Sequence, residues 1–297
     1  MWKADICLHH FPCDDGFAAA WVVNRKWPDV VLKGTNYGQP FPEVDIDGKN
    51  LLIADFSYKP DELARLSARA KSIVILDHHK TADTDLRDVK RMVGANCENV
   101  EAAFAGRPGP GTNVLAEFDM ARSGASLAWQ FCFPGEKMPE LIRYVEDRDL
   151  WLMKLDHSRS LSLLLQSYPY DLAVWNELML AFDDVGGAQA RVLGEARAIE
   201  RFFDRRLAEL IPTAVFKQIG KWKGIPVAFA PYAFASDLAN ALLKAHPEAP
   251  FAAVVVEAYG SRTWSLRSED SRQDVSEVAK AFGGGGHRNA AGFRVPV

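Results

Sequence analysis

Runs of apolar residues alternate with amphipathic stretches in the first third of the chain. The apolar runs are rich in β-branched residues and leucine, which is typical of buried strands, and they lie at 5–8, 51–54 and 73–76. Apolar positions at helical spacing follow at 16–26 and at 61–71, where Pro60 marks the start of a helix. This alternation predicts an α/β domain with helices on the faces of a parallel sheet.

Helical patterns dominate the middle of the chain, and strand patterns return near its end. Helices are expected at 123–133, at 138–145 and over most of 171–210. Strands are expected at 225–230, 251–258, 263–267 and 292–295, with a helix at 236–244 that has Ser236 as its N-cap. The pattern therefore predicts three parts, which are a parallel-sheet domain at 1–165, a helical connector at 166–212 and a smaller α/β domain at 213–297.

Composition narrows the class of protein. With 297 residues, 48% of them hydrophobic, the chain is long enough for two domains, since single cores rarely grow past about 250 residues. A net charge of -4 argues against long duplex nucleic acid as a partner and favours short anionic substrates. The four cysteines lack zinc-finger and disulfide spacing, and no run approaches the roughly 20 apolar residues of a membrane span. We therefore expect a reduced, cytoplasmic protein with no membrane contact.

Side chains that bind metals follow each of the first three predicted strands. The third strand closes on Asp77-His78-His79, the second on Asp55, and the first runs into the segment 9–16, which is rich in histidine and aspartate. Because the carboxyl ends of parallel strands share one edge of a sheet, these side chains are expected to form one site. Carboxylate and imidazole together suit Mn²⁺ or a similar cation, and a pair of such cations supports phosphodiester hydrolysis.

In the order of its motifs the chain resembles the DHH phosphoesterases that carry the DHH-associated C-terminal domain. The resemblance covers nearly the whole length, and its motifs lie at 10–17, 53–56, 77–79, 145–149 and, in a glycine-rich segment, 284–293. It implies a catalytic DHH domain at 1–165 and a substrate-binding domain at 213–297.

The resemblance also implies two metal sites that share Asp55 as a bridging ligand. One cation would be bound by His10, Cys13 and Asp55, and the other by Asp15, Asp55, His78 and Asp147. Asp77 would orient an imidazole, which is the usual supporting role of a carboxylate, and His79 would face the scissile phosphate. In the C-terminal domain the substrate would be held by Arg267, Ser268, the backbone of Gly284, Gly285 and Gly286, and His287.

Three details of this assignment stay open. Position 13 is usually aspartate in the family; Cys13 is a softer ligand that favours Zn²⁺ or Fe²⁺, unless it is a small buried filler or adjacent Asp14 takes its place. His9 and His10 are alternative ligands, and His10 is favoured. Asp149 is expected to be structural, although its role and that of Asp147 could be exchanged.

The expected function is a metal-dependent phosphoesterase that uses two divalent cations, most readily Mn²⁺. Its substrates would be short and nucleotidic, such as oligoribonucleotides, linear or cyclic dinucleotides, or a 3′-phosphorylated nucleotide. The alternative is a nucleotide sensor that does not hydrolyse, with a metal site degenerate at Cys13. The sequence leaves monomer and homodimer equally open.

Overall fold

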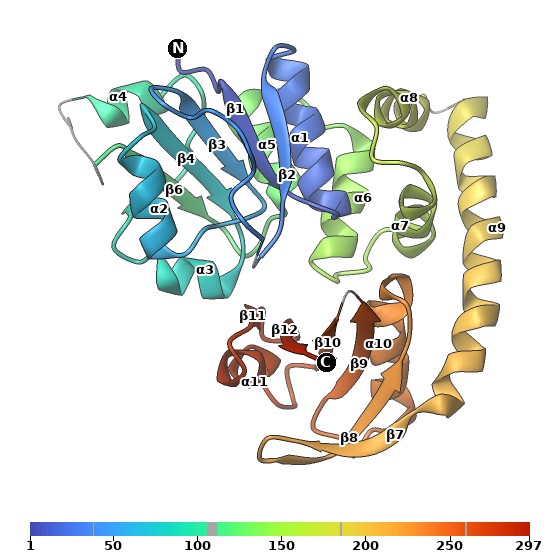
Figure 1. Ribbon diagram of the computed structural model, residues 1–297. Coiled ribbons are helices and arrows are strands. Elements are labelled where there is room, and N and C mark those ends of the chain that lie inside the picture. The colour runs from blue at the N-terminus through green and yellow to red at the C-terminus, as the bar shows by residue number, and fades with distance from the viewer. Residues whose placement is uncertain (38, 106–111, 185, 259) are drawn as a thin grey trace. The chain divides into compact units, whose positions relative to one another are not determined.

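The computed structural model describes residues 1–297 except 38, 106–111, 185 and 259. The chain forms two compact units, Met1–Ile199 and Glu200–Val297. The long helix α9 (Gly187–Leu210) runs across the boundary between them (Figure 1).

A parallel sheet forms the centre of the first unit. Among its described residues six strands pair in the order β2-β1-β3-β4-β6-β5, and every pairing is parallel. The strands are β1 (Ile6–His10), β2 (Val31–Thr35), β3 (Asn50–Ala54), β4 (Ser72–Asp77), β5 (Lys90–Arg91) and β6 (Val114–Phe118). The predicted fold class and the three predicted N-terminal strands are confirmed.

The sequence pattern did not indicate strands β2 and β6. Strand β2 is at the edge of the sheet and largely exposed, so its residues lack the apolar alternation of a half-buried strand. Strand β6 is buried, but its short apolar run, Val114-Leu115-Ala116, is followed by the charged residue Glu117.

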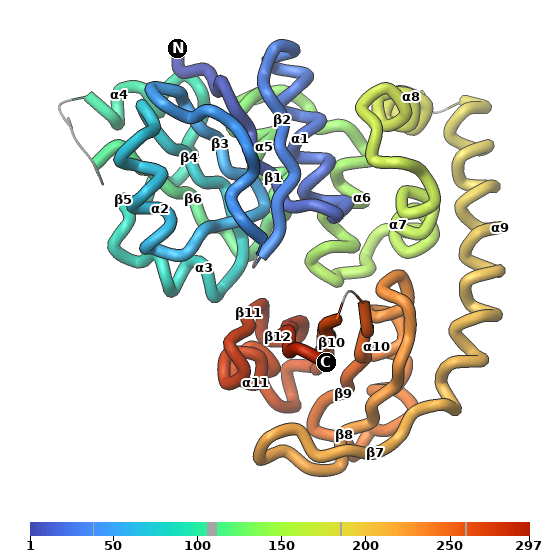
Figure 2. The backbone as a smooth tube through the Cα atoms, in the orientation of Figure 1, coloured from blue at the N-terminus to red at the C-terminus, as the bar shows by residue number. Residues whose placement is uncertain are grey.

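The strand order reverses beside β1, and this reversal positions the site. From β1 the chain passes through helix α1 (Asp14–Lys26) to β2 on one side, then returns to β3 on the other side (Figure 2). Crossovers that leave a sheet in opposite directions open a crevice at the carboxyl ends of the strands, which is where open α/β sheets bind ligands.

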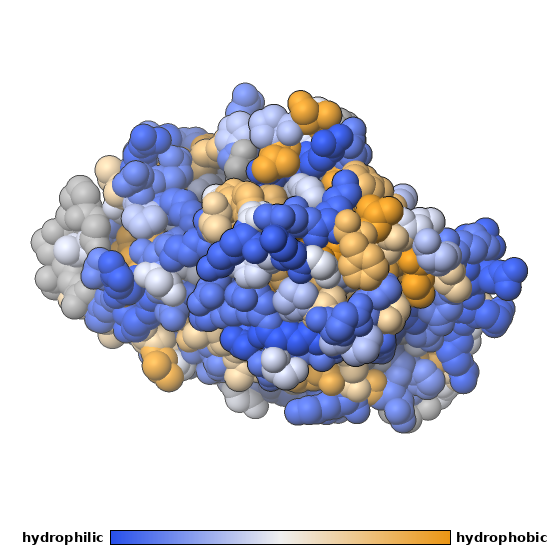
Figure 3. Space-filling model, turned by 90° about the horizontal axis from the view of Figure 1, so that it is seen from below, coloured by the Kyte–Doolittle hydropathy of each residue, from blue (hydrophilic) through white to orange (hydrophobic). Residues whose placement is uncertain are grey.

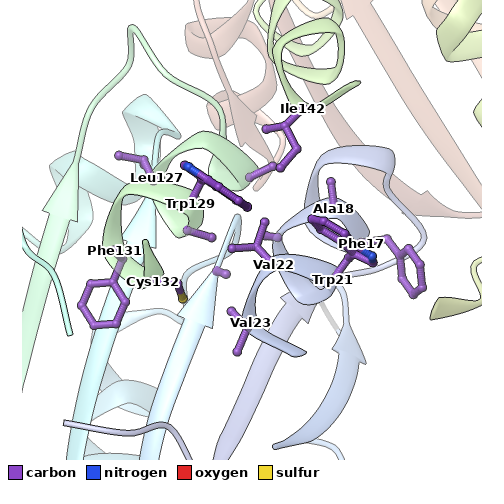
Figure 4. Packing of buried hydrophobic residues seen from close by; sticks show 14 of the residues in the cluster. Phe17, Ala18, Trp21, Val22, Val23, Leu127, Trp129, Phe131, Cys132 and Ile142 are labelled. Atoms are coloured by element: carbon purple, nitrogen blue, oxygen red, sulfur yellow. The ribbon is translucent and has the colours of Figure 1, made fainter. Parts of the chain in front are cut away.

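The central strands are buried on both faces because helices cover both sides of the sheet. In β3, Leu52 and Ala54 pack in one core, whereas Leu51 and Ile53 pack in a second core on the opposite face. Figure 4 shows the first core between α1 and α5, with Trp129 among its residues. The helices of this unit are α1, α2 (Pro60–Ser67), α3 (Lys80–Asp85), α4 (Val100–Phe104), α5 (Gly124–Cys132), α6 (Glu140–Asp149), α7 (Ser158–Ser167), α8 (Leu172–Asp183) and the first half of α9.

The second unit has a mixed sheet of its own. Its strands pair in the order β11-β12-β10-β9-β8-β7, antiparallel except for β8 with β9. The elements are β7 (Val215–Ile219), β8 (Trp222–Phe229), α10 (Ala235–Ala245), β9 (Ala252–Ala258), β10 (Ser261–Arg267), α11 (Val275–Ala281), β11 (Gly285–Gly286) and β12 (Ala290–Pro296). The prediction that Ser236 caps α10 is wrong, because Phe234 occupies the N-cap and Ser236 lies in the first turn.

The surface is mainly hydrophilic on the face drawn in Figure 3, where hydrophobic residues occur in small groups. None of the helices among the described residues has the length and apolar character that a membrane crossing requires.

Replacement of a buried apolar residue should destabilise the protein far more than replacement of an exposed one. Phe131 is fully buried in α5 and packs edge-on against Trp2, with 5.6 Å between the ring centroids. We expect Phe131→Ala to lower the free energy of unfolding in urea by about 3–5 kcal/mol. Leu180 in α8 is 58% exposed, so Leu180→Ala should change it by less than about 0.5 kcal/mol. Equal losses in the two variants would contradict the packing described here.

Candidate metal centre

The chemistry-bearing side chains come from the carboxyl ends of three adjacent strands and from two helix ends. His10 ends β1, Asp55 follows β3 directly, and Asp77 ends β4. Asp15 lies in the first turn of α1, and Asp149 is the last residue of α6. Five separate elements therefore bring these residues to the crevice at the point where the strand order reverses.

Asp55 is the centre of this arrangement. Its side chain is 2% exposed, and its backbone adopts a left-handed conformation with φ of 56°, which is rare for residues other than glycine but commoner for aspartate. One carboxylate oxygen, Oδ1, lies 3.1 Å from Nε2 of His78. The other, Oδ2, lies 3.5 Å from Nδ1 of His10 and 3.5 Å from Sγ of Cys13. The two oxygens of one carboxylate thus face two different sets of side chains that could bind a metal.

The second set consists of His78 and two carboxylates. Nε2 of His78 lies 3.4 Å from Oδ2 of Asp149 and 3.9 Å from Oδ2 of Asp15. One ligand atom from each of these three residues lies within 4.8 Å of the others, and the same holds for His10, Cys13 and Asp55. These distances suit a group of side chains around a cation.

The charges of the cluster are those of a cation site. Burial raises the pKa of Asp15 well above its ordinary value, and the negative charges of Asp55 and Asp149 raise it further. Burial opposes ionisation of Asp55 too, but hydrogen bonds from His10 and His78 lower its pKa well below the ordinary value. Carboxylates this close repel one another in a low-dielectric site, and a divalent cation would remove that repulsion. The nitrogen, oxygen and sulfur donors present fit a transition-metal dication.

Helix α5 supports Asp15 from a distant part of the chain. The backbone amides of Gly124 and Ala125 donate to its two carboxylate oxygens, at 2.6 and 3.0 Å. Ser123, the N-cap, accepts a hydrogen bond from the amide of Ser126. The amino terminus of a helix favours an anion. The helix at 123–133 was expected from the sequence, but the bond from its Gly124 to Asp15, 109 positions away, was not.

Asp77 organises the turn that contains the two histidines. Its Oδ1 accepts from the backbone amide of His78 at 2.7 Å and lies 2.7 Å from Nδ1 of His79. Its Oδ2 accepts from the hydroxyl of Ser57. The carboxylate therefore holds the His79 ring through Nδ1, which is the supporting role expected for Asp77.

The structure places Asp149, and not Asp147, beside His78, as in the alternative that the sequence left open. The Asp147 carboxylate accepts hydrogen bonds from the amides of Lys154 and Leu155 and from the hydroxyl of Ser158, so it ties down the loop after α6. Asp149, expected to be structural, is the residue whose carboxylate reaches His78. Because positions 147 and 149 lie about 200° apart around a helix, only one of them faces the sheet edge. The sequence pattern alone did not identify which one.

The structure also distinguishes the two histidines of the first motif. His10 faces Asp55, as preferred from the sequence, and Asn36 also hydrogen-bonds to its ring. His9 is buried with its ring edge-on to Phe11, and Nδ1 lies 3.1 Å from the carbonyl oxygen of His10. Burial lowers the pKa of His9 to about 4, so this residue is neutral at physiological pH.

Sequence reasoning missed Asn36 and Tyr37, which directly follow β2. The Tyr37 ring centroid lies 5.7 Å from that of His10 and 6.0 Å from that of His79, so it flanks both imidazoles. Had β2 been predicted, these two residues would have been candidates for the site, because they lie at the carboxyl end of a strand next to β1.

In the second unit the expected substrate-binding residues lie near one end of the sheet. Arg267, at the end of β10, donates from one guanidinium nitrogen to the hydroxyl of Ser236 and from another to the carbonyl oxygen of Leu266. Gly285 and Gly286 form β11, and His287 follows. A substrate-binding role for Arg267, Gly285, Gly286 and His287 stays a prediction.

Two members of that set have their polar groups occupied within the protein. The Gly284 amide donates to the carbonyl oxygen of Ala279, so it is not directed to an anion as expected. An added Cβ at Gly284 would lie 2.0 Å from the carbonyl oxygen of Gly292, so glycine is needed there for close strand packing. Ser268 is 5% exposed, and its hydroxyl lies 3.5 Å from the carbonyl oxygen of Pro250.

Comparisons with known proteins bear on the fold and the family. No family model matches the chain. Uncharacterized protein R106 of Acanthamoeba polyphaga mimivirus is 26% identical over 98% of this chain and 67% of its own length. Oligoribonuclease NrnB of Bacillus subtilis is 35% identical over 101 residues, which are 34% of this chain and 23% of NrnB. The chain thus spans about two thirds of the first relative and matches less than a quarter of the second.

A solved structure shares the fold. The DHH domain of a protein from a family of ribosomal proteins superposes with a TM-score of 0.52 at 14% identity, over 98% of this chain and 82% of that one. The resemblance to DHH proteins that the motifs indicated is confirmed in the fold.

The glycine at the start of α5 offers a test of the site's packing. A Cβ at Gly124 would lie 2.4 Å from Cβ of Asp55 and 3.0 Å from Oδ2 of Asp15. We expect Gly124→Ala to lower the free energy of unfolding by about 1–3 kcal/mol and to weaken Mn²⁺ binding, measured by titration calorimetry.

Gly194 in α9 is the matched control, because an added Cβ there has open space around it. Gly194→Ala should stabilise the helix by roughly 0.5–1 kcal/mol and leave Mn²⁺ binding unchanged. If both variants bound Mn²⁺ as the wild type does, Gly124 would have no part in shaping the centre.

Proposed function

We infer that this protein, which has the DHH-domain fold and the motifs of the DHH phosphoesterases, is a metal-dependent hydrolase of phosphoester bonds. The proposal rests on the position of the Asp55 carboxylate. One of its oxygens faces His78, and the other faces His10 and Cys13. A carboxylate shared in this way is the bridging ligand that a two-cation phosphoesterase needs.

Two divalent cations would be held by the two ligand sets. One set is His10, Cys13 and Asp55, and the other is Asp15, Asp55, His78 and Asp149. When bound, such a pair lowers the pKa of a water molecule and neutralises charge on the phosphoryl oxygens. Mn²⁺ suits the nitrogen and oxygen donors, while Cys13 increases the affinity for softer cations such as Zn²⁺.

The chain's own residues would position the substrate and move protons. Asp77 holds Nδ1 of His79, which keeps the imidazole in one orientation. With Nδ1–H donated to Asp77, the proton that the ring can transfer is the second one, on Nε2 of the imidazolium form. His79 is 17% exposed at the rim of the cluster, so a phosphate or leaving group can reach it. We assign His79 the transfer of a proton to the leaving oxygen.

The proposed substrates are short and nucleotidic, such as oligoribonucleotides or dinucleotides. A net charge of -4 does not suit long polyanions, and the matching segment of NrnB belongs to a protein named as an oligoribonuclease. In the second unit, Arg267 would bind a phosphate of the substrate remote from the cleaved bond, together with the β11 backbone and His287.

The first test is replacement of the shared carboxylate. We expect Asp55→Asn to reduce Mn²⁺-dependent hydrolysis of a diribonucleotide by more than about 100-fold, the loss that removal of even an outer partner of a metal ligand can cause. Dialysis against EDTA should abolish wild-type activity, and added Mn²⁺ should restore it.

Asp47 is a suitable control carboxylate for Asp55→Asn because it is 66% exposed and paired with Arg69. Asp47→Asn should retain full activity. Normal hydrolysis by Asp55→Asn would refute the site. Absence of wild-type turnover with Mn²⁺, Co²⁺ and Zn²⁺, together with measurable nucleotide binding, would instead favour a sensor.

Cys13 provides a separate test of metal choice. Burial raises the pKa of the thiol well above its ordinary value, and the nearby carboxylates raise it further, so the thiol must lose a proton before it can bind a cation. Cys13→Asp should retain activity and reach half-maximal rate at a Mn²⁺ concentration roughly tenfold lower than the wild type, since oxygen ligands suit Mn²⁺ better. Complete loss of activity in Cys13→Asp would show that the thiol has a role of its own.

A further inference from the structure

An apolar segment is exposed directly after α6. Trp151, Leu152 and Met153 are 38%, 45% and 36% exposed, although a tryptophan is usually far more buried than this. The proposed chemistry does not use this segment, and neither core of the first unit includes it. Such a patch of large side chains on a protein surface is often a binding site.

The backbone of this segment is held in a defined shape. Trp151 and Met153 both adopt left-handed conformations, with φ of 56° and 52°, which large side chains rarely do. The carbonyl oxygen of Asp147 accepts from the amide of Leu152 at 2.9 Å, and the Asp147 carboxylate accepts from Lys154, just beyond the segment. The exposed side chains therefore project from a fixed turn, and Asp147 is the residue that fixes it.

The turn lies next to the metal centre. Trp151 follows Asp149 by two residues, so their Cα atoms are at most roughly 7.6 Å apart. Asp149 itself reaches His78 in the cluster. The turn that carries this indole therefore begins within two residues of the cluster.

The indole has a cation over one face. The guanidinium carbon of Arg148 lies 4.1 Å from the centroid of the Trp151 ring, in a cation–π arrangement. The stacked guanidinium holds the ring in place, so little side-chain entropy would be lost when a planar group stacks on the exposed part of the ring. Aromatic side chains beside a phosphate-binding site are the usual platform for nucleobases.

We propose that Trp151 is a stacking platform for the nucleobase next to the scissile phosphate, held by Arg148 and flanked by Leu152 and Met153. This role deepens the proposed phosphoesterase function and presupposes it. The patch comprises three consecutive residues between the charged Arg148 and Lys154, which suits one planar base better than a protein partner.

The first experiment compares substrates with and without the base. With 5′-phosphorylated diadenosine, Trp151→Ala should raise KM roughly 5- to 150-fold, the effect of losing one stacked base, with kcat changed less than about threefold. Trp151→Phe should retain most of the affinity. The second substrate is the same dinucleotide without the base at the stacked position. Its KM with the wild type should equal the KM of the intact dinucleotide with Trp151→Ala. The substitution should not raise the KM of the abasic dinucleotide further.

Phe202 is the matched control, since it is 67% exposed on α9 with Arg206 over its ring at 5.6 Å. Phe202→Ala should leave KM unchanged. The proposal is overturned if Trp151→Ala leaves the KM of the intact dinucleotide unchanged, or if it raises the KM of the intact and of the abasic dinucleotide by the same factor. A fall in melting temperature without a change in KM would likewise overturn it, and would show that the ring packs within the protein.

A binding measurement without added metal separates this proposal from the hydrolytic one. Adenosine 5′-monophosphate should quench the indole fluorescence of the wild type, and the quenching should largely disappear in Trp151→Phe, although seven other tryptophans remain. Quenching without hydrolysis would contradict the proposed hydrolase and support the stacking platform. Hydrolysis without this quenching would support the hydrolase and contradict the stacking platform.

Discussion

The rest of the centre depends on the contacts that the Asp55 carboxylate makes. It is buried directly after β3, and its two oxygens face His78 and the His10–Cys13 pair, so both groups of side chains meet at it. The strand order explains why such a residue exists here. Because the chain leaves β1 and β3 toward opposite faces of the sheet, the end of β3 lies in a crevice rather than beneath a helix.

A second group of carboxylates supports the first without sharing its chemistry. Asp77 holds the turn of the two histidines, and Asp147 holds the turn that carries Trp151. Both are buried, and their carboxylate oxygens accept hydrogen bonds from backbone amides and hydroxyls. Asp147 and Asp149 show that a supporting acid and an acid of the cluster can lie only two positions apart in the sequence. Removal of a supporting acid would therefore disturb the acid of the cluster beside it.

The sequence predicted the fold class and the strands that carry the site, because the central strands are buried on both faces and their residues are continuous apolar runs. It also indicated which strand ends carry the side chains of the cluster. It could not resolve Asp147 from Asp149, since that choice depends on the rotation of α6 about its axis. Gly124, Asn36 and Tyr37 were missed because their value comes from contacts with distant residues, which no local pattern encodes.

The support of Asp15 by α5 has a consequence for how the protein is made. The amides that receive this carboxylate lie 109 and 110 positions further along the chain, so the centre cannot close until the ribosome has released most of the first unit. Before that point the acids of the early motifs have no helix terminus to neutralise them. A cation that binds only the closed centre would draw the folding equilibrium toward the native state in proportion to its free concentration. The free concentration of the metal during folding would then set how much of the newly synthesised chain reaches the native state.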